Sequence, residues 1–319
     1  MNPKQIQVDE HGLPVAQGFG DEPPGRGERS AARWYKTRPA RRVLGVVAVL
    51  AVMVPLLYPK LRTSVPPMLA EWWHNRAQQR YYSDNLGGAL SDLDLAIGIV
   101  PDDHELHAEL FRLRGLYRLD DYEREGHLQE AISDFDRAIE LDPKLADTYA
   151  ARSRALQRLG RHRAGLDDLE RYVKLRPKNN PQALNARAYG RALAETELYE
   201  ALQDIQQAIK SNRAPEAAYL DTRGWIHYLR GDYKAALADM DLAIVLAKKE
   251  KLHWFGRLHH DPSIEPGRRS FLMRRFDENL GVMHHHRGKV HEKLGSAAQA
   301  DSDLQLGEEL GYDPARGVW

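Results

Sequence analysis

The 319-residue chain contains no cysteine, carries no net charge and has only one long uncharged apolar run. The absence of cysteine excludes disulfide bonds and thiolate metal sites, although it does not identify the cellular compartment. The 46 Lys and Arg residues balance the 46 Asp and Glu residues, so no overall basic field attracts nucleic acid, and we expect no nucleic-acid partner. G-x-S-x-G, Walker A and strand-linked G-x-G-x-x-G motifs are also missing. We therefore predict that the chain is not an enzyme and takes no cofactor and no small-molecule substrate.

The first 40 residues are rich in Gly, Pro, Arg and Glu and show almost no periodic apolar pattern. Such a segment cannot bury enough apolar surface to offset the entropy lost on ordering, and it predicts a disordered tail over residues 1–40. Residues 1–42 hold eight Lys and Arg against five Asp and Glu, and seven of the basic residues lie between Arg26 and Arg42. The tail is therefore expected to be basic.

Val43–Tyr58 is a run of sixteen residues without a charge, flanked by Arg41, Arg42, Lys60 and Arg62. A full span takes about 20 apolar residues, but flanking basic side chains reach the headgroups, and we predict a transmembrane helix over 41–60. The positive-inside rule then places the tail in the cytoplasm and the remaining chain outside, as in a single-pass cell-membrane protein. A cleaved signal peptide and a buried core helix are the alternatives. A Pro-containing stretch over 61–72 predicts a linker.

The segment AISDFDRAIELDP, residues 131–143, contains the pattern on which the rest of the chain is built. Ala131, Ile132, Phe135, Ala138 and Ile139 share one stripe of a helix, and the alanines keep this stripe thin enough for a second helix to lie close. The pattern returns near residues 89, 165, 201, 236 and 300. A helix repeated in this way cannot bury its stripe alone, so the sequence predicts an all-α stack of about six helix pairs.

The spacing of these units resembles the tetratricopeptide repeat, because Pro143 and Pro177 lie 34 residues apart and small residues recur at fixed places. Gly160 and Gly231 stand where that family has its turn glycine. The resemblance implies an α-solenoid with repeats over 73–246, an insertion over 247–279, and a last repeat with a C-terminal tail over 280–319. Residues 267–294 have the apolar spacing of one long helix that continues into the last repeat.

Two series of charged residues also follow the repeat period. Aspartate stands three residues after the first small position of every second helix, at Asp92, Asp134, Asp168, Asp204, Asp239 and Asp303. Arginine precedes the small residue of five first helices, at Arg114, Arg152, Arg187, Arg223 and Arg287. Opposite charges at equivalent points of facing helices predict a ladder of Arg–carboxylate contacts with a structural role.

The resemblance also implies a concave groove that binds a protein or peptide partner. Carried over residue by residue, the groove candidates are Arg154, Arg158, Asp221, Trp225, Tyr228, His285 and Lys289. The carboxylate clamp of the chaperone-binding members is absent, because Ala150, Ala186 and Asp221 occupy its positions. A mixture of arginine and aromatic side chains suits a peptide with aromatic anchors and carboxylates. A solvated surface without a fixed ligand is the alternative.

From these observations we predict a membrane-tethered scaffold for protein–protein interactions, held in the membrane through Val43–Tyr58. A soluble or cytosol-facing adaptor with the same repeats is the alternative. A metal-dependent enzyme that uses histidines between His253 and His291 is a more remote one. We predict no metal site, because H-x-x-x-H and HExxH spacings are missing and adjacent helical histidines point in different directions.

Overall fold

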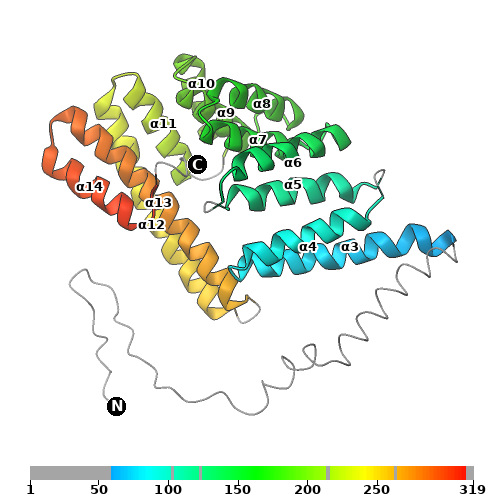
Figure 1. Ribbon diagram of the computed structural model, residues 1–319. Helices are drawn as coiled ribbons and strands as arrows, with labels where there is room; N and C mark the ends of the chain where they lie inside the picture. Colours follow the sequence, from blue (N-terminus) through cyan, green and yellow to red (C-terminus); the bar gives the residue numbers. More distant parts are fainter. Residues whose placement is uncertain (1–58, 102–103, 122–123, 213–215, 262–263, 314–319) are drawn as a thin grey trace, which may run out of the picture. The chain divides into compact units, whose positions relative to one another are not determined.

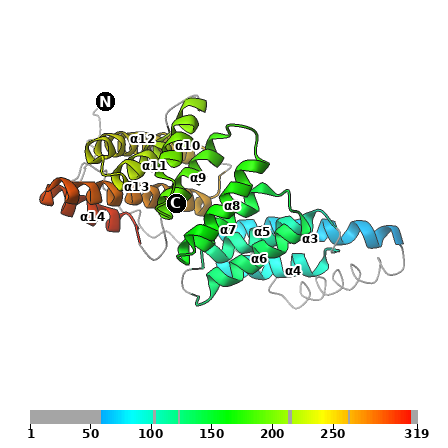
Figure 2. The same ribbon diagram turned by 90° about the horizontal axis from the view of Figure 1, so that it is seen from above.

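The computed structural model describes residues 59–101, 104–121, 124–212, 216–261 and 264–313. Within these ranges all regular structure is α-helical, with no strand, which confirms the all-α part of the predicted fold (Figure 1). The helices are α3 (Pro59–Tyr82), α4 (Leu86–Ile99), α5 (Leu106–Leu119), α6 (His127–Leu141), α7 (Ala146–Arg158), α8 (His162–Leu175), α9 (Pro181–Leu193), α10 (Leu198–Ser211), α11 (Ala217–Leu229), α12 (Tyr233–His260), α13 (Pro266–Leu294) and α14 (Ala297–Glu309). Consecutive helices form pairs from α3–α4 to α13–α14 (Figures 1 and 2). Apart from the first residues of α3, these pairs lie in the unit of residues 64–319.

No helix in the described ranges is long and apolar enough to cross a membrane. This finding contradicts the predicted single-pass membrane localisation, which was wrong. The predicted span, Val43–Tyr58, and the predicted tail over 1–40 both lie outside the described residues. The helix that follows, α3, carries Lys60, Arg62, Glu71 and Arg76, and its polarity is unsuited to hydrocarbon.

The predicted linker over 61–72 is instead part of α3, which continues through Pro66 and Pro67. A proline inside a helix removes one hydrogen bond and costs about 3 kcal/mol, and for this reason the sequence indicated a break. Ala70 and Ala77 are fully buried against the α4 core residues Ala89 and Leu93. Packing of one helix face against the next helix therefore outweighs the local propensity of the chain.

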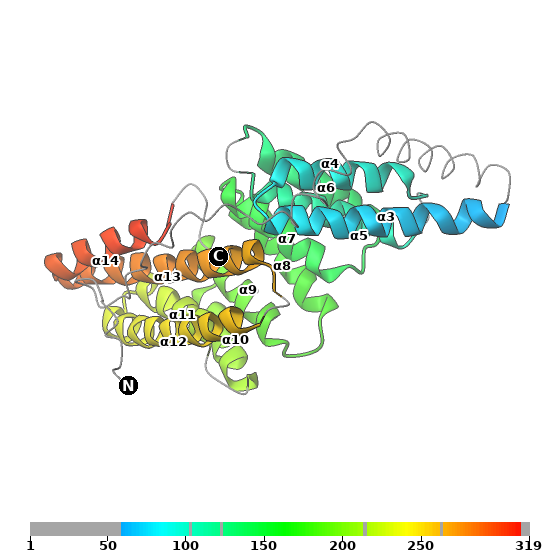
Figure 3. The ribbon, with the colours of Figure 1, turned by 90° about the horizontal axis from the view of Figure 1, so that it is seen from below.

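The residues predicted as an insertion, 247–279, form no separate element. They lengthen the second helix of the fifth pair and the first helix of the sixth, so that α12 has 28 residues and α13 has 29 (Figures 1 and 3). Lys251 on α12 pairs with Asp277 on α13, and Leu258 near the end of α12 is buried. The two extensions form a helical hairpin that projects beyond the normal length of a pair.

Within each pair, small residues allow the two helices to approach closely. A Cβ atom on Gly115 of α5 would lie 2.6 Å from the ring of Phe135 on α6, which is fully buried. The turns between helices use glycine in the left-handed region, as at Gly160 (φ +71°) and Gly231 (φ +82°). These glycines hold the turn positions implied by the repeat resemblance.

The six aspartates of the sequence series are buried, with exposed fractions of only 1–9%. Each one accepts hydrogen bonds from an arginine on the first helix of its own pair, and the arginine Nε lies 2.7–3.1 Å from the nearer carboxylate oxygen. The first pair supplies Arg76, which the sequence analysis missed. A second basic residue four positions later also approaches the carboxylate in every pair except the third, where Leu156 stands at that position.

The same arginines also connect neighbouring pairs. Arg114 Nη1 donates to Asp94 of the preceding pair at 2.8 Å, and Arg152 Nη1 donates to Asp136 at 2.6 Å. Arg187 and Arg287 reach Glu170 and Asp241 in the same way, at 2.9 Å and 2.8 Å. These acceptors stand two residues after the buried aspartate of the preceding pair. After the fourth pair this position is Gln206, and the contacts of Arg223 described here are to its own pair only.

The last pair adds a buried histidine to this arrangement. His284 is 1% exposed, and its Nδ1 lies 2.8 Å from Asp303 Oδ1. Burial alone would raise the pKa of Asp303, but hydrogen bonds from His284 and Arg287 outweigh it and lower the pKa to about 2. The Asp303 carboxylate therefore remains ionised over the physiological range.

The extended hairpin brings the sixth pair into contact with the first. Phe271 on α13 lies edge-on to Tyr81 and Tyr82 at the end of α3, with ring centroids 5.1 Å and 5.4 Å away. The guanidinium of Arg268 lies 4.9 Å from the centroid of the Tyr82 ring. Gly267 packs directly on the backbone of Tyr82, where a Cβ atom would be 2.7 Å from the carbonyl oxygen. The two terminal pairs of the described stack therefore contact each other.

The Arg–Asp ladder predicts a specific pattern in a double-mutant cycle. Arg152→Leu should destabilise the full chain by about 1–3 kcal/mol, because it leaves the buried carboxylate of Asp168 without its guanidinium partner. Burial already raises the pKa of Asp168, which shows that its charge is costly at this position. Adding Asp168→Leu should recover part of this loss, since both polar partners are then replaced. Urea unfolding measures the three variants, with the exposed Arg171→Leu on α8 as control. Strictly additive effects at 152 and 168 would contradict the ladder.

The contact between terminal pairs is tested with two glycines of the same hairpin. Gly267→Ala should destabilise the chain by about 1–3 kcal/mol, because its Cβ meets the Tyr82 backbone. Gly256→Ala on α12 should stabilise it by up to about 1 kcal/mol, because nothing lies within 4 Å of the added Cβ and alanine favours helix. Urea unfolding separates the two cases. Shifts of equal sign would mean that the Gly267 contact does not form.

Candidate functional site

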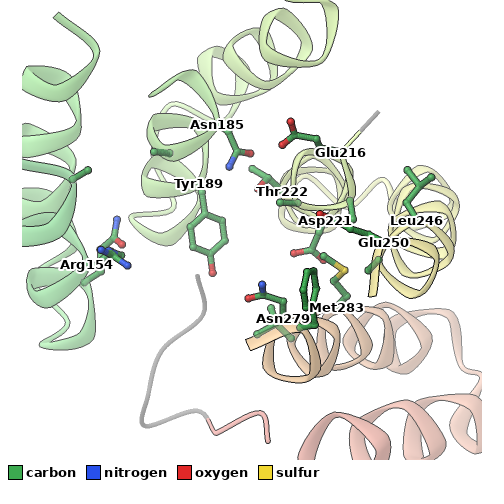
Figure 4. A pocket seen from close by; sticks show the side chains of 18 of the residues that line it. Arg154, Asn185, Tyr189, Glu216, Asp221, Thr222, Leu246, Glu250, Asn279 and Met283 are labelled. Atoms are coloured by element: carbon green, nitrogen blue, oxygen red, sulfur yellow. The ribbon is translucent and has the colours of Figure 1, made fainter. Parts of the chain in front are cut away.

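A groove of about 970 Å³ lies between the first helices of the middle pairs and the extended hairpin. Side chains from α5, α7, α9 and α11 line one part of it, and residues of α12 and α13 line the other. Figure 4 shows Asn185 and Tyr189 of α9 between Arg154 on α7 and the side chains of Asp221 and Met283. The lining therefore comes from five successive helix pairs.

The ladder arginines determine which residues face this groove. Two positions along a helix correspond to a rotation of about 200°, so residues two before and two after a ladder arginine lie on the opposite side. The groove-lining residues at these positions are Arg112, Ala150, Arg154, Asn185, Tyr189 and Asp221. When a ladder arginine points into the stack, the residues two positions before and after it therefore point towards the groove.

Two residues of α9 that line the groove, Asn185 and Tyr189, each carry a buried polar atom without a hydrogen-bonding partner among the described residues. Asn185 Oδ1 and Tyr189 Oη are both inaccessible to solvent, and neither has a partner among the described residues. Burial, together with the charge of Asp221, raises the pKa of the Tyr189 hydroxyl, so that it remains a neutral donor. Leaving such a group unsatisfied costs about 1–3 kcal/mol, and a ligand that supplies a partner regains this energy.

The wall of the groove opposite α9 has an apolar part beside the polar residues Lys249, Glu250, His253 and Asn279. Leu246 on α12 and Phe276, Val282 and Met283 on α13 contribute this apolar part. Charges are distributed unevenly along the groove. On the second and third pairs Arg112 and Arg154 outnumber Asp147, whereas on the fifth pair Glu216, Asp221 and Glu250 outnumber Lys249. The groove is therefore amphipathic across its width and polarised along its length.

Asp221 is fixed by a buried histidine of α13. His286 is 1% exposed, and its Nδ1 lies 3.0 Å from both oxygens of Asp221. Because an ionised carboxylate only accepts hydrogen bonds, Nδ1 carries the proton in this contact. The His286 ring also stacks on Trp225, with centroids 4.4 Å apart. This contact attaches the hairpin to α11 at the floor of the groove.

The groove contains two of the seven predicted residues, Arg154 and Asp221. Trp225 and Tyr228 instead stack on each other with centroids 4.7 Å apart and pack against the core of the stack. They were predicted to line the groove, but α13 crosses α11 at this point and covers them. Asn185 and Tyr189 were missed, and their spacing of two residues from Arg187 is the sequence signal that identifies them.

The other three candidates also lie outside the groove lining. Arg158 Nη1 donates to the carbonyl of Leu119 at 2.6 Å and secures the end of α5. Lys289 pairs with Glu292 on its own helix. His285 stacks on Tyr312 with centroids 4.1 Å apart. These side chains contribute to the packing of the last pair and of α5.

The histidines between His253 and His291 do not form a metal site in the described residues. No group of three or more His, Asp or Glu side chains in this part of the chain is placed to hold a metal ion. His284 and His286 each face a different carboxylate, Asp303 and Asp221, from opposite sides of α13. The contacts His284–Asp303 and His286–Asp221 give both histidines a structural role.

Comparison with known proteins supports the repeat assignment. Residues 122–145, which include the Ala131–Leu141 stripe, match the model of the tetratricopeptide repeat family. The chain carries a tetratricopeptide repeat. A tetratricopeptide repeat protein from Parabacteroides merdae has the same fold, with a TM-score of 0.50 at 17% identity, over 77% of this chain and 94% of that one. The fold implied by the resemblance is therefore confirmed.

Two curated relatives are similar in sequence. Mitochondrial import receptor subunit TOM70 of Homo sapiens is 25% identical over 192 residues, and the Rattus norvegicus protein of the same name is 25% identical over 191 residues. Each match covers 60% of this chain. The matched region spans only 31% of the length of either relative.

His285 provides a pH-dependent test of the packing beside the groove. Burial, assisted by the charges of His286 and Lys289, lowers its pKa from 6.5 to about 4, against the opposing effect of Glu292. The unfolded chain therefore binds the proton first, and the stabilisation present above pH 6.5 is lost as the pH falls towards 4. His285→Gln should flatten this part of the stability profile. Histidine NMR should place the folded-state midpoint near 4, and a midpoint near 6.5 would contradict the packing.

Proposed function

We propose that this protein is an interaction scaffold that holds a peptide segment of a partner protein in the groove. The observation that carries this proposal is the pair of buried, unsatisfied polar groups, Asn185 Oδ1 and Tyr189 Oη, on residues that line a groove with apolar side chains in its opposite wall. A peptide has both chemistries that such a groove needs. Its main chain supplies hydrogen-bond donors and acceptors, and its side chains supply apolar surface.

The comparisons support the same function at a coarser level. The tetratricopeptide repeat in residues 122–145 is a protein-interaction repeat, and the two similar proteins are named import receptor subunits. A receptor subunit binds other proteins rather than converting a substrate. Because only about a third of either relative is matched, we do not extend the import role to this chain, and we retain only the binding of a protein partner.

The groove also predicts the character of the bound segment. Apolar side chains of the peptide face Leu246, Phe276 and Met283, while its main chain faces Asn185 and Tyr189. Arg154 favours acidic side chains towards the third pair, and the carboxylates of the fifth pair favour basic side chains at the other end. We therefore propose an amphipathic peptide that is acidic at one end and basic at the other.

A phage-displayed library of random peptides about twelve residues long tests this proposal with the full chain as bait. Selected peptides should combine apolar residues with the predicted order of charges. Asn185→Ala should weaken their binding by about tenfold, the size expected for a lost buried hydrogen bond, as measured by fluorescence polarisation. Tyr189→Phe should weaken it similarly.

The exposed Tyr199→Phe on α10 is the matched control, because it removes the same hydroxyl from a tyrosine outside the groove. Binding should be unchanged in this variant. Selection of no peptide, or of peptides equally sensitive to Tyr189→Phe and Tyr199→Phe, would refute binding in the groove.

A further inference from the structure

Helix α12 exposes a second apolar surface beside the groove. The exposed fractions are 46% for Leu242, 60% for Val245, 72% for Leu252 and 46% for Phe255. We call these four residues the outer stripe. Groove-lining Leu246, Glu250 and His253 lie on the adjoining face of α12, and Lys249, which also lines the groove, lies where the two faces meet. One helix therefore presents two different surfaces.

The spacing of the outer stripe is that of a helix-packing surface. Leu242, Val245, Lys249 and Leu252 follow one another at intervals of three, four and three residues, which is the a and d spacing of a heptad. Phe255 and Lys248 flank this row at the g position. Single exposed apolar residues, such as Leu95 on α4, are common on protein surfaces, but a contiguous heptad row marks an interaction site.

The charges around the stripe distinguish between possible occupants. Lys248 and Lys249 are exposed and lie within or beside the row. Asp241 at its edge already accepts a hydrogen bond from Arg287, and Glu250 lines the groove. A second copy of α12 would therefore cover these lysines without offering a carboxylate, and in an antiparallel arrangement the two Lys248 side chains would meet. A partner with acidic residues pairs with both lysines.

We propose that the outer stripe binds an amphipathic helix of another protein, with its apolar row against Leu242, Val245 and Leu252 and acidic residues facing Lys248 and Lys249. The stripe adjoins the groove at Lys249, which lines the groove as well, so the protein holds two partners, or two parts of one partner, on adjacent faces of α12. The length of α12, 28 residues, gives the stripe about two heptads of contact, whereas the second helices of the other pairs have 13–15 residues.

The probe is a stapled, monomeric helical peptide about three heptads long, with Leu at a and d and Glu at e and g. Its binding to the full chain is measured by fluorescence polarisation against a second peptide in which Lys replaces every Glu. The acidic peptide should bind, and the basic peptide should bind at least about tenfold more weakly. Leu252→Glu should abolish binding, and Lys248→Glu, which leaves the groove-lining Lys249 in place, should reduce the preference for the acidic peptide.

Leu95→Glu is the matched control, since Leu95 is an exposed leucine on α4 outside the stripe, and it should leave binding unchanged. Circular dichroism of each variant should be unchanged because the substituted side chains are exposed. Equal binding of both peptides, binding of neither, or indifference to Leu252→Glu would overturn the proposal. Sedimentation that shows a dimer converted to a monomer by Leu252→Glu would assign the stripe to a second copy instead.

Discussion

A carboxylate buried between two helices must be paired with a cation, and this requirement organises the whole stack. Each of the six second helices places an aspartate in a buried position, and the first helix of the same pair supplies an arginine that pairs with it. Because the same guanidinium also reaches the preceding pair, as Arg152 does to Asp136, it fixes the spacing both within and between pairs. The bidentate geometry leaves little freedom in how the helices face one another.

The groove follows from this constraint. Once Arg187 is directed into the stack, helix geometry directs Asn185 and Tyr189 to the opposite side, where they line the groove. The hairpin α12–α13 then supplies what the repeats lack, an apolar wall. A polar surface set by the repeat period thus faces apolar side chains contributed by the two lengthened helices of the fifth and sixth pairs.

The sequence predicted the helix pairs and the Arg–Asp contacts well, because both recur at a period that local structure alone does not produce. It predicted the groove poorly, since family positions were transferred without knowing that α13 crosses α11 and covers Trp225. The linker over 61–72 was wrong because proline propensity is local, whereas the burial of Ala70 and Ala77 depends on a helix later in the chain. The membrane localisation rested on the composition of one run without any packing information.

The contact between Phe271 and the tyrosines at the end of α3 gives the two terminal helix pairs of the stack an additional packing partner. In an open stack of repeats, the outermost units have one neighbour and fray first, so exchange of amide hydrogens and proteolysis start there. Here the first pair packs against the sixth pair as well as against the second, and the sixth packs against the first as well as against the fifth. Neither is a preferred starting point for local opening, and loss of one pair removes support from the opposite end of the sequence.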